Sequence, residues 1–178
     1  MFYNGVYVWE RSEMKATPTL VAGIIDNLRR VFQVVNEQSK RAEHETGLTG
    51  PQLWAIKIIA ESAPIKVSDL ARKMYLHPAT VVGIIDRLET RGFVERTRST
   101  KDRRVVEITL TDQGKEVVAQ SPEVAQGLLV KGLEVLPDKK LAHIFDGLEQ
   151  LVKILGAQEI PPQLILSQEV NLPRTRKK

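Results

Sequence analysis

Apolar residues recur at intervals of three and four residues through most of the chain, which is the period of an amphipathic α-helix. The first such stretch begins at Pro18, directly after the capping residue Thr17, and Gly47 suits its end because glycine tolerates positive φ. The last stretch runs from about Asp138 to Leu155 and carries a long apolar seam. The pattern therefore predicts a long amphipathic helix near each end of the chain.

Three shorter helices are predicted between them, over residues 48–63, 68–74 and 78–92. The first opens with Thr49 and, three residues on, Gln52, which is the pattern of a capping box. Ser68 is expected to cap the second helix, and a tight turn at residues 75–77 separates it from the third. The apolar face of the third helix consists of Val81, Ile84, Ile85 and Leu88.

After Gly92 the apolar residues alternate with polar ones, which is the period of a β-strand. Residues 93–98 and 105–110 are predicted to pair as a β-hairpin around a polar, charged loop. Thr111 is expected to cap a further helix, which Pro122 should kink or break because proline lacks a backbone donor.

Two short helices joined by a tight turn and followed by a β-hairpin are the pattern of a winged helix-turn-helix. The predicted fold is mainly α with a small β-hairpin, and residues 48–110 are expected to form a winged helix-turn-helix DNA-binding lobe. Residues 17–47 and 111–156 are expected to form a helical dimerisation region, because so small a chain offers their apolar faces too little partner surface. Residues 1–16 and 157–178 are expected to be irregular segments.

Positive charge is concentrated in the predicted hairpin. Between Arg96 and Arg104 there are five basic residues and one acid, Asp102, and their sum of +4 equals the net charge of the whole chain. A cationic hairpin can contact phosphates, and a narrow minor groove attracts arginine through its negative potential. Asp102 can hold a neighbouring guanidinium in one direction through a charge-assisted hydrogen bond. The hairpin is therefore predicted to contact double-stranded DNA.

The third short helix is the expected recognition helix, called the reading helix below, because a major groove admits one α-helix. The residues opposite its apolar face are Ala79, Val82, Gly83, Asp86, Arg87 and Thr90. Small residues at its start allow close approach to base edges, and free N–H groups near Ala79 and Thr80 are expected to donate to a phosphate. Val82 is placed to touch a thymine methyl. Asp86 and Arg87 are also expected to form an ion pair.

Four segments carry a resemblance to the MarR family of bacterial transcriptional regulators. They are residues 48–53, residues 67–71, residues 85–96 and the wing-to-helix run 102–114. The resemblance covers roughly residues 20–155 and implies an obligate homodimer, with each reading helix in a major groove and each wing in a minor groove. It also implies a small aromatic or phenolic effector, bound between the dimerisation region and the lobes.

Roles carried over from that family fall on four positions. Arg104 resembles the wing arginine, Asp102 its orienting partner, Ser68 a phosphate contact and Thr80 a reading-helix contact. The candidate DNA-binding residues are Ser68, Pro78, Ala79, Thr80, Val82, Gly83, Arg87, Arg96, Arg98, Lys101, Asp102, Arg103 and Arg104.

Composition removes several other classes of function. The chain has no cysteine, which excludes disulfides, thiolate catalysis and cysteine-based metal sites, and fits a reducing cytoplasm. His44, His77 and His143 lack metal-ligand spacing, and His77 is expected to cap the reading helix or touch the DNA backbone. No apolar run reaches the ~18–20 residues of a membrane span. No metal, cofactor or catalytic motif is expected, so an enzyme is disfavoured.

The sequence therefore predicts a cytoplasmic, sequence-specific DNA-binding transcriptional regulator, a repressor that binds a pseudo-palindromic operator as a homodimer. The alternative is a protein-interaction module that uses the winged lobe without binding DNA. The basic residues of the wing distinguish the two, because a lobe that binds only proteins has no need of them.

Overall fold

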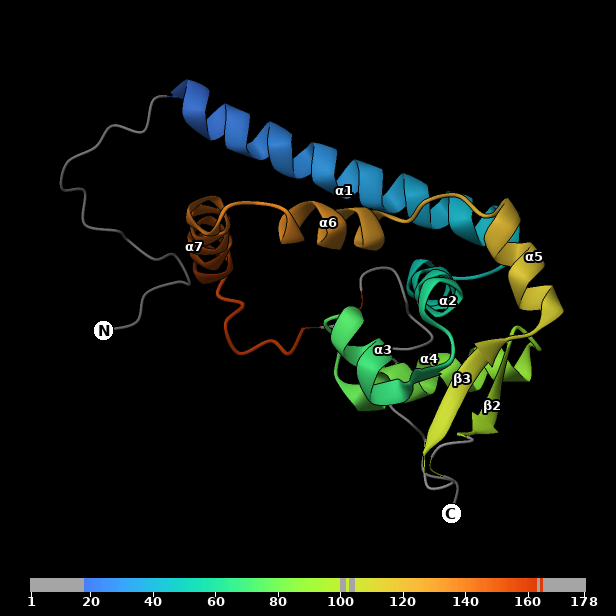
Figure 1. Cartoon of the computed structure of the whole chain (residues 1–178). Coiled ribbons are helices and arrows are strands. Elements are labelled where there is room, and N and C mark those ends of the chain that lie inside the picture. The colour runs from blue at the N-terminus through green and yellow to red at the C-terminus, as the bar shows by residue number, and fades with distance from the viewer. Residues whose placement is uncertain (1–17, 100–101, 103–104, 163, 165–178) are drawn as a thin grey trace, which may run out of the picture. The chain divides into compact units, whose positions relative to one another are not determined.

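The computed structural model describes residues 18–99, 102, 105–162 and 164. These residues form a mainly helical fold with a small sheet, as the sequence predicts. The elements in chain order are α1 (Pro18–Thr46), α2 (Gly50–Ser62), β1 (Ile65–Lys66), α3 (Val67–Lys73), α4 (Pro78–Thr90), β2 (Val94–Arg98), β3 (Val106–Leu110), α5 (Asp112–Gln120), α6 (Ala125–Glu134) and α7 (Asp138–Ile154). Figure 1 labels them.

The chain divides into two compact units, with the boundary inside α1 between Gln33 and Val34. The described part of the first unit, residues 18–33, is one amphipathic helix whose apolar side chains lie in solvent, Leu20 and Phe32 each with 63% of their surface exposed. The second unit holds the winged lobe together with α5, α6 and α7. No helix in the described ranges is both long and apolar enough to span a membrane.

Helix α2 is the centre of the lobe because most of its residues are apolar and buried. Nine of its residues are buried, and it contacts α3, α4, α5, α6 and β3, as Figure 1 shows. Such a helix is stable only inside a core. The largest fully buried side chains include Leu53, Ile56 and Ile59 of α2. The core thus fixes the orientation of both helices of the helix-turn-helix motif.

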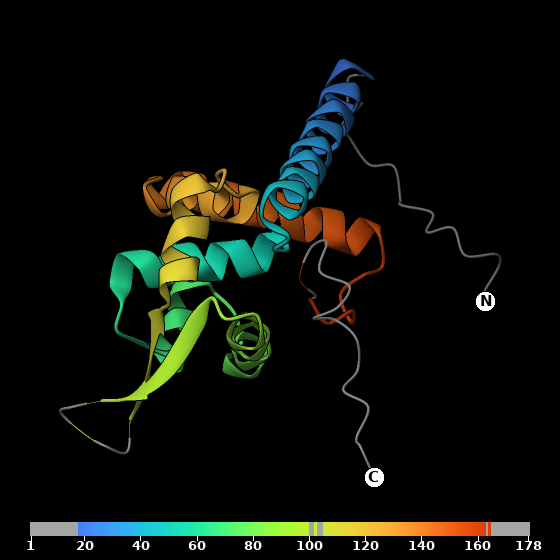
Figure 2. The ribbon, with the colours of Figure 1, turned by 90° about the vertical axis from the view of Figure 1, so that its right-hand side faces the viewer.

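The sheet is antiparallel and has the strand order β1–β3–β2. Figure 2 shows the β2–β3 hairpin extending beyond the helices of the lobe. The first strand was not predicted, because two residues are too short to show a period. Ile65 of β1 lies opposite Ile108 of β3 in the register, and both are buried, so this pair anchors the hairpin to the core.

The helix starts agree in part with the expected caps. The capping box predicted at Thr49 and Gln52 forms, and the side-chain oxygen of Gln52 accepts the N–H of Thr49 at 3.1 Å. Nδ1 of His77 accepts the N–H of Ala79 at 3.3 Å, which confirms the expected cap of α4. The cap expected at Ser68 is wrong: the chain passes directly from β1 into α3, so Lys66 is the N-cap residue.

Pro122 breaks the helix in which it lies. α5 ends at Gln120 and α6 begins at Ala125, which confirms the predicted interruption. Helix α7 follows and, within the described chain, buries none of its 17 residues. Beyond α7, Leu164 is half-buried against the core of the lobe.

Candidate DNA-binding surface

Helix α4 has one closed face and one open face. It begins with His77 as N-cap and Pro78 at the first helical position, where the missing N–H of proline costs nothing. Val81, Ile84, Ile85 and Leu88 are fully buried against the core. Since residues three and four apart share a face, the opposite flank of α4 is directed outward.

The predicted contact residues of α4 lie on that open flank. Pro78 and Ala79 are exposed, whereas Thr80, Val82, Gly83 and Arg87 are half-buried. The free N–H groups expected at the start of the helix are occupied within the chain. Ala79 donates to His77 Nδ1, and Thr80 donates to the His77 carbonyl at 2.9 Å. A phosphate at this end would compete with those bonds, so donation by these amides stays a prediction, as do contacts by the side chains.

Arg96 of β2 joins the wing to the reading helix. Its guanidinium donates to the carboxylate of Asp86 at 2.6 Å and to that of Glu89, both on α4. The Arg96 side chain is 27% exposed, so the pairing is only partly screened by solvent. Both terminal nitrogens of Arg96 are thereby engaged inside the lobe. The DNA contact predicted for Arg96 stays a prediction, and the structure supports instead a role in positioning α4.

Sequence reasoning did not find this ion-pair cluster. The ion pair expected between Asp86 and Arg87 stays a prediction, while Asp86 also pairs with Arg96, ten residues along the chain. No local spacing signals such a contact, because it forms only when the hairpin folds back beside α4. The cluster also leaves two carboxylates and one guanidinium on the flank of the reading helix.

The tip of the wing is described in part. Arg98 ends β2 and is exposed, as is Asp102. The Asp102 carbonyl accepts the N–H of Val105 at 2.9 Å, and the Val105 carbonyl accepts the N–H of Ser99 at 2.9 Å, so a backbone turn closes the loop. Lys101, Arg103 and Arg104 lie outside the described residues, and their predicted contacts stay predictions.

Ser68 and the turn between α3 and α4 complete the surface. Ser68 is exposed in the first turn of α3, beside Asp69, which pairs with Arg72 at 2.8 Å. In the turn, Tyr75 adopts a φ of 51°, in the left-handed region that few non-glycine residues occupy. Its hydroxyl donates to the carboxylate of Glu134 at the end of α6, at 2.8 Å. This bond ties the helix-turn-helix motif to a helix outside the predicted lobe.

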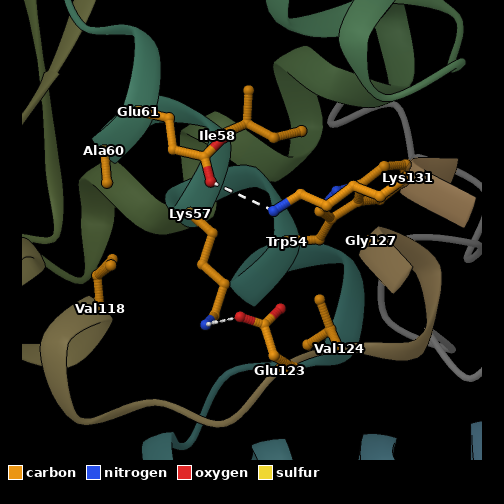
Figure 3. Close-up of a pocket in the computed structure, with 10 residues that line it drawn as sticks. All are labelled: Trp54, Lys57, Ile58, Ala60, Glu61, Val118, Glu123, Val124, Gly127 and Lys131. Carbon is orange, nitrogen blue, oxygen red and sulfur yellow. Dashed lines mark hydrogen bonds and ion pairs between the residues drawn. The ribbon is translucent and has the colours of Figure 1, made fainter. Parts of the chain in front are cut away.

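A cavity of about 130 Å³ lies between α2, the end of α5 and α6 (Figure 3). Trp54 forms part of its wall, and the amine of Lys57 lies 3.6 Å from the carboxylate of Glu123. Lys131 lies 3.5 Å from Glu61 across the same region. A Cβ at Gly127 would lie 3.3 Å from the Trp54 ring, so glycine leaves this wall open. The sequence placed Trp54 in the core, where it is 8% exposed, and the resemblance implied an effector site between the lobe and the dimerisation region without naming residues that line it.

The fold and the open flank of α4 together define a winged helix-turn-helix protein with a reading helix and a wing. The family model described as MarR family matches residues 48–106. The transcriptional repressor MdtR of Bacillus subtilis is 29% identical over 140 residues, which are 77% of this chain and 90% of MdtR. The transcriptional regulator FarR of Neisseria gonorrhoeae is 29% identical over 76% of this chain and 93% of its own.

Solved structures show the same fold. FabT of Streptococcus pneumoniae, in complex with DNA, aligns with a TM-score of 0.50 at 22% identity over 76% of this chain and 97% of FabT. The regulator BldR of Sulfolobus solfataricus aligns with a TM-score of 0.50 at 21% identity over 79% of this chain and 99% of its own. The chain belongs to the MarR family and is a DNA-binding transcriptional regulator. The relatives named here are regulators and not enzymes.

Proposed function

We propose that this regulator is a repressor that binds a pseudo-palindromic operator as a homodimer and that a small aromatic or phenolic effector releases it. The observation that carries the proposal is the division of apolar surface. The lobe buries its apolar side chains, whereas α6 and α7 leave theirs in solvent. A second copy of the chain carries the same exposed apolar helix faces, so the two copies would cover one another's.

The apolar stripe of α7 supports the dimer. Ile144, Phe145, Leu148 and Val152 are 41%, 62%, 54% and 41% exposed, and they recur at helical spacing. Leu128, Leu129 and Leu133 of α6 are 37–47% exposed as well. Complete burial of one such side chain is worth roughly 1.5–3 kcal/mol. Pairing these helices with those of a second copy would remove the exposed stripes from water.

A two-fold dimer explains why the operator should be a pseudo-palindrome. Each copy would present α4 to a major groove, and half-sites for such dimers lie about one helical turn apart, roughly 34–36 Å. Arg98 and the predicted contacts of Lys101, Arg103 and Arg104 would extend the surface to the phosphates and the adjacent minor groove. The repressor role of MdtR favours repression here.

The cavity beside Trp54 supports the proposal that an effector binds this protein. Its volume of about 130 Å³ is close to the roughly 150 Å³ of an apolar cavity that accepts a benzene ring. Its wall combines helix α2 of the lobe with α6, whose apolar face belongs to the proposed dimer surface. A ring bound there would alter how the lobe packs on the helices that hold the two copies together.

Four measurements test the proposal. Analytical ultracentrifugation should show a dimer, and selection from a random duplex pool should enrich a two-fold symmetric site. Binding to that site should weaken steeply as salt is raised, because several phosphates are contacted. Replacing Arg104 by Ala should weaken binding and leave the circular dichroism spectrum unchanged. A monomer, or a folded protein that enriches no DNA, would favour the alternative of a protein-binding lobe.

Release by an effector needs its own test. Small aromatic acids and phenols should be screened for dissociation of the selected complex, followed by fluorescence anisotropy. The variant G127V should abolish the response of a compound found in this way, because the added side chain would meet the Trp54 ring. The variant G147V on α7 is the control once sedimentation shows that it remains a dimer, since a Cβ at Gly147 meets nothing within 4 Å in its own chain.

A further inference from the structure

In its first two turns the open flank of α4 carries methyl groups and few hydrogen-bonding groups. Its first two turns, from Pro78 to Ile85, contain no Arg, Lys, Asn or Gln. The side chains that are exposed or half-buried there are those of Pro78, Ala79, Thr80 and Val82, together with the bare backbone of Gly83. Guanine is usually read by Arg or Lys and adenine by Asn or Gln, so these two turns lack the standard groups for hydrogen-bonded reading of purines.

Farther along α4, the side chains of Asp86, Glu89 and Thr90 are engaged within the chain. Asp86 and Glu89 accept hydrogen bonds from Arg96, and the hydroxyl of Thr90 donates to the Asp86 carbonyl at 2.7 Å. An acidic side chain that read cytosine would have to leave that cluster. The half-buried Val82 lies one turn before Asp86 on the same flank, with a small residue on either side along the helix face, Ala79 and Gly83. The backbone of α4 can therefore approach the bases closely at this point.

Resting on the proposed function, we infer that Val82 determines operator specificity by packing against the C5-methyl group of thymine. Thymine is the one standard base that presents a methyl group in the major groove, and small apolar side chains contact it there. Ala79, one turn earlier, adds a second apolar contact on the same strip. The operator half-site should therefore contain thymines that are recognised by their methyl groups.

Replacing thymine by uracil tests the inference directly, because uracil keeps every hydrogen-bonding edge and lacks only the methyl group. The operator is first selected from a random duplex pool with the full chain. Each thymine of one half-site is then replaced singly by deoxyuridine, and dissociation constants are measured by anisotropy. At one or two positions the affinity should fall about fourfold, the value for one buried methyl group.

A thermodynamic cycle assigns the contact to Val82. In V82A the penalty for uracil at those positions should disappear, and in V82T, which keeps one methyl group, it should be intermediate. V106A is the matched control: Val106 is a valine of β3 that is 44% exposed, and its loss should leave the uracil penalties unchanged. The uracil series with the wild-type chain is decisive even if V82A folds poorly.

The possible outcomes distinguish a failure of the proposed function from a failure of the role inferred for Val82. An enriched operator that tolerates uracil at every thymine overturns the inference and leaves the proposed function standing. Uracil penalties that persist in folded V82A overturn the assignment to Val82. A pool in which no sequence is enriched overturns the proposed function and this inference together.

Discussion

Helices α4 and α7 carry the same kind of apolar stripe, yet only one of them is covered. The four stripe residues of α4 have no exposed surface, whereas those of α7 are 41–62% exposed. Helix α4 packs on α2, α3 and β2 in its own chain. The difference shows that an amphipathic pattern specifies that a face must be covered, and leaves open which chain covers it. In the proposed dimer, α7 is covered by the second copy.

Breaking the covered stripe should have the largest effect. We expect L88A to lower the free energy of unfolding by about 2–5 kcal/mol, because it removes buried atoms and leaves a cavity in the lobe. Urea denaturation followed by circular dichroism measures the loss, and the loss should be the same at high and low protein concentration. A change below about 1 kcal/mol would contradict the packing described for α4.

Charging the open stripe should break the dimer and leave the lobe folded. In L148E a carboxylate would be buried without a partner in the interface, so the dimer dissociation constant should rise by about a hundredfold or more. Sedimentation velocity measures the change, and retained helical circular dichroism shows that the chain still folds. The control is E149Q, on the neighbouring position, which should remain a dimer. An L148E protein that stays dimeric would place the interface elsewhere.

Removing Arg96 should disturb α4, whereas removing Arg98 should affect only DNA binding. In R96A the carboxylates of Asp86 and Glu89 lose their shared partner, and we expect a loss of about 1–3 kcal/mol in stability together with weaker operator binding. R98A should keep full stability. The slope of log binding constant against log salt concentration should become shallower by about one unit. Urea denaturation measures the stability of both variants, and salt titrations measure their binding. If R96A and R98A were equally stable, Arg96 would have no role in positioning α4.

The smallest effect concerns the bond between the helix-turn-helix turn and α6. The carboxylate of Glu134 accepts the Tyr75 hydroxyl and repels the phenolate, so it raises the pKa of Tyr75 above its ordinary value of 10.0. In E134Q the repulsion is lost, and the pKa of Tyr75 should fall back toward that value. NMR titration of the Tyr75 ring resonances measures it. An unchanged titration in E134Q would mean that the lobe and α6 are not joined at this point.

Local patterns predicted most of the fold. The apolar spacing of Val81, Ile84, Ile85 and Leu88 identified the buried face of α4, and the change of period after Gly92 identified the hairpin. Proline rules located the break at Pro122. These predictions succeeded because each depends on residues within about two helical turns of one another. β1 was missed because it has only two residues and exists through its pairing with β3.

The candidate site was predicted less completely than the fold. The open flank of α4 followed from the helical period, but the partners of its polar groups did not. Arg96 was counted with the phosphate-binding cations, and the structure places it against Asp86 and Glu89. Ser68 was expected to cap α3, a position that Lys66 occupies. The cavity beside Trp54 depends on segments from three helices and has no signature in any one of them.

The amino-acid sequence by itself determined the helices, the wing, the charge of the wing and the methyl-rich flank of the reading helix, because periodicity, capping and composition act over short distances. Only the tertiary structure decided which charged side chains form ion pairs inside the lobe, which apolar helix faces stay exposed and where a cavity remains. These properties depend on contacts between residues far apart in the chain, and their free energies are set by burial and geometry that no local pattern records.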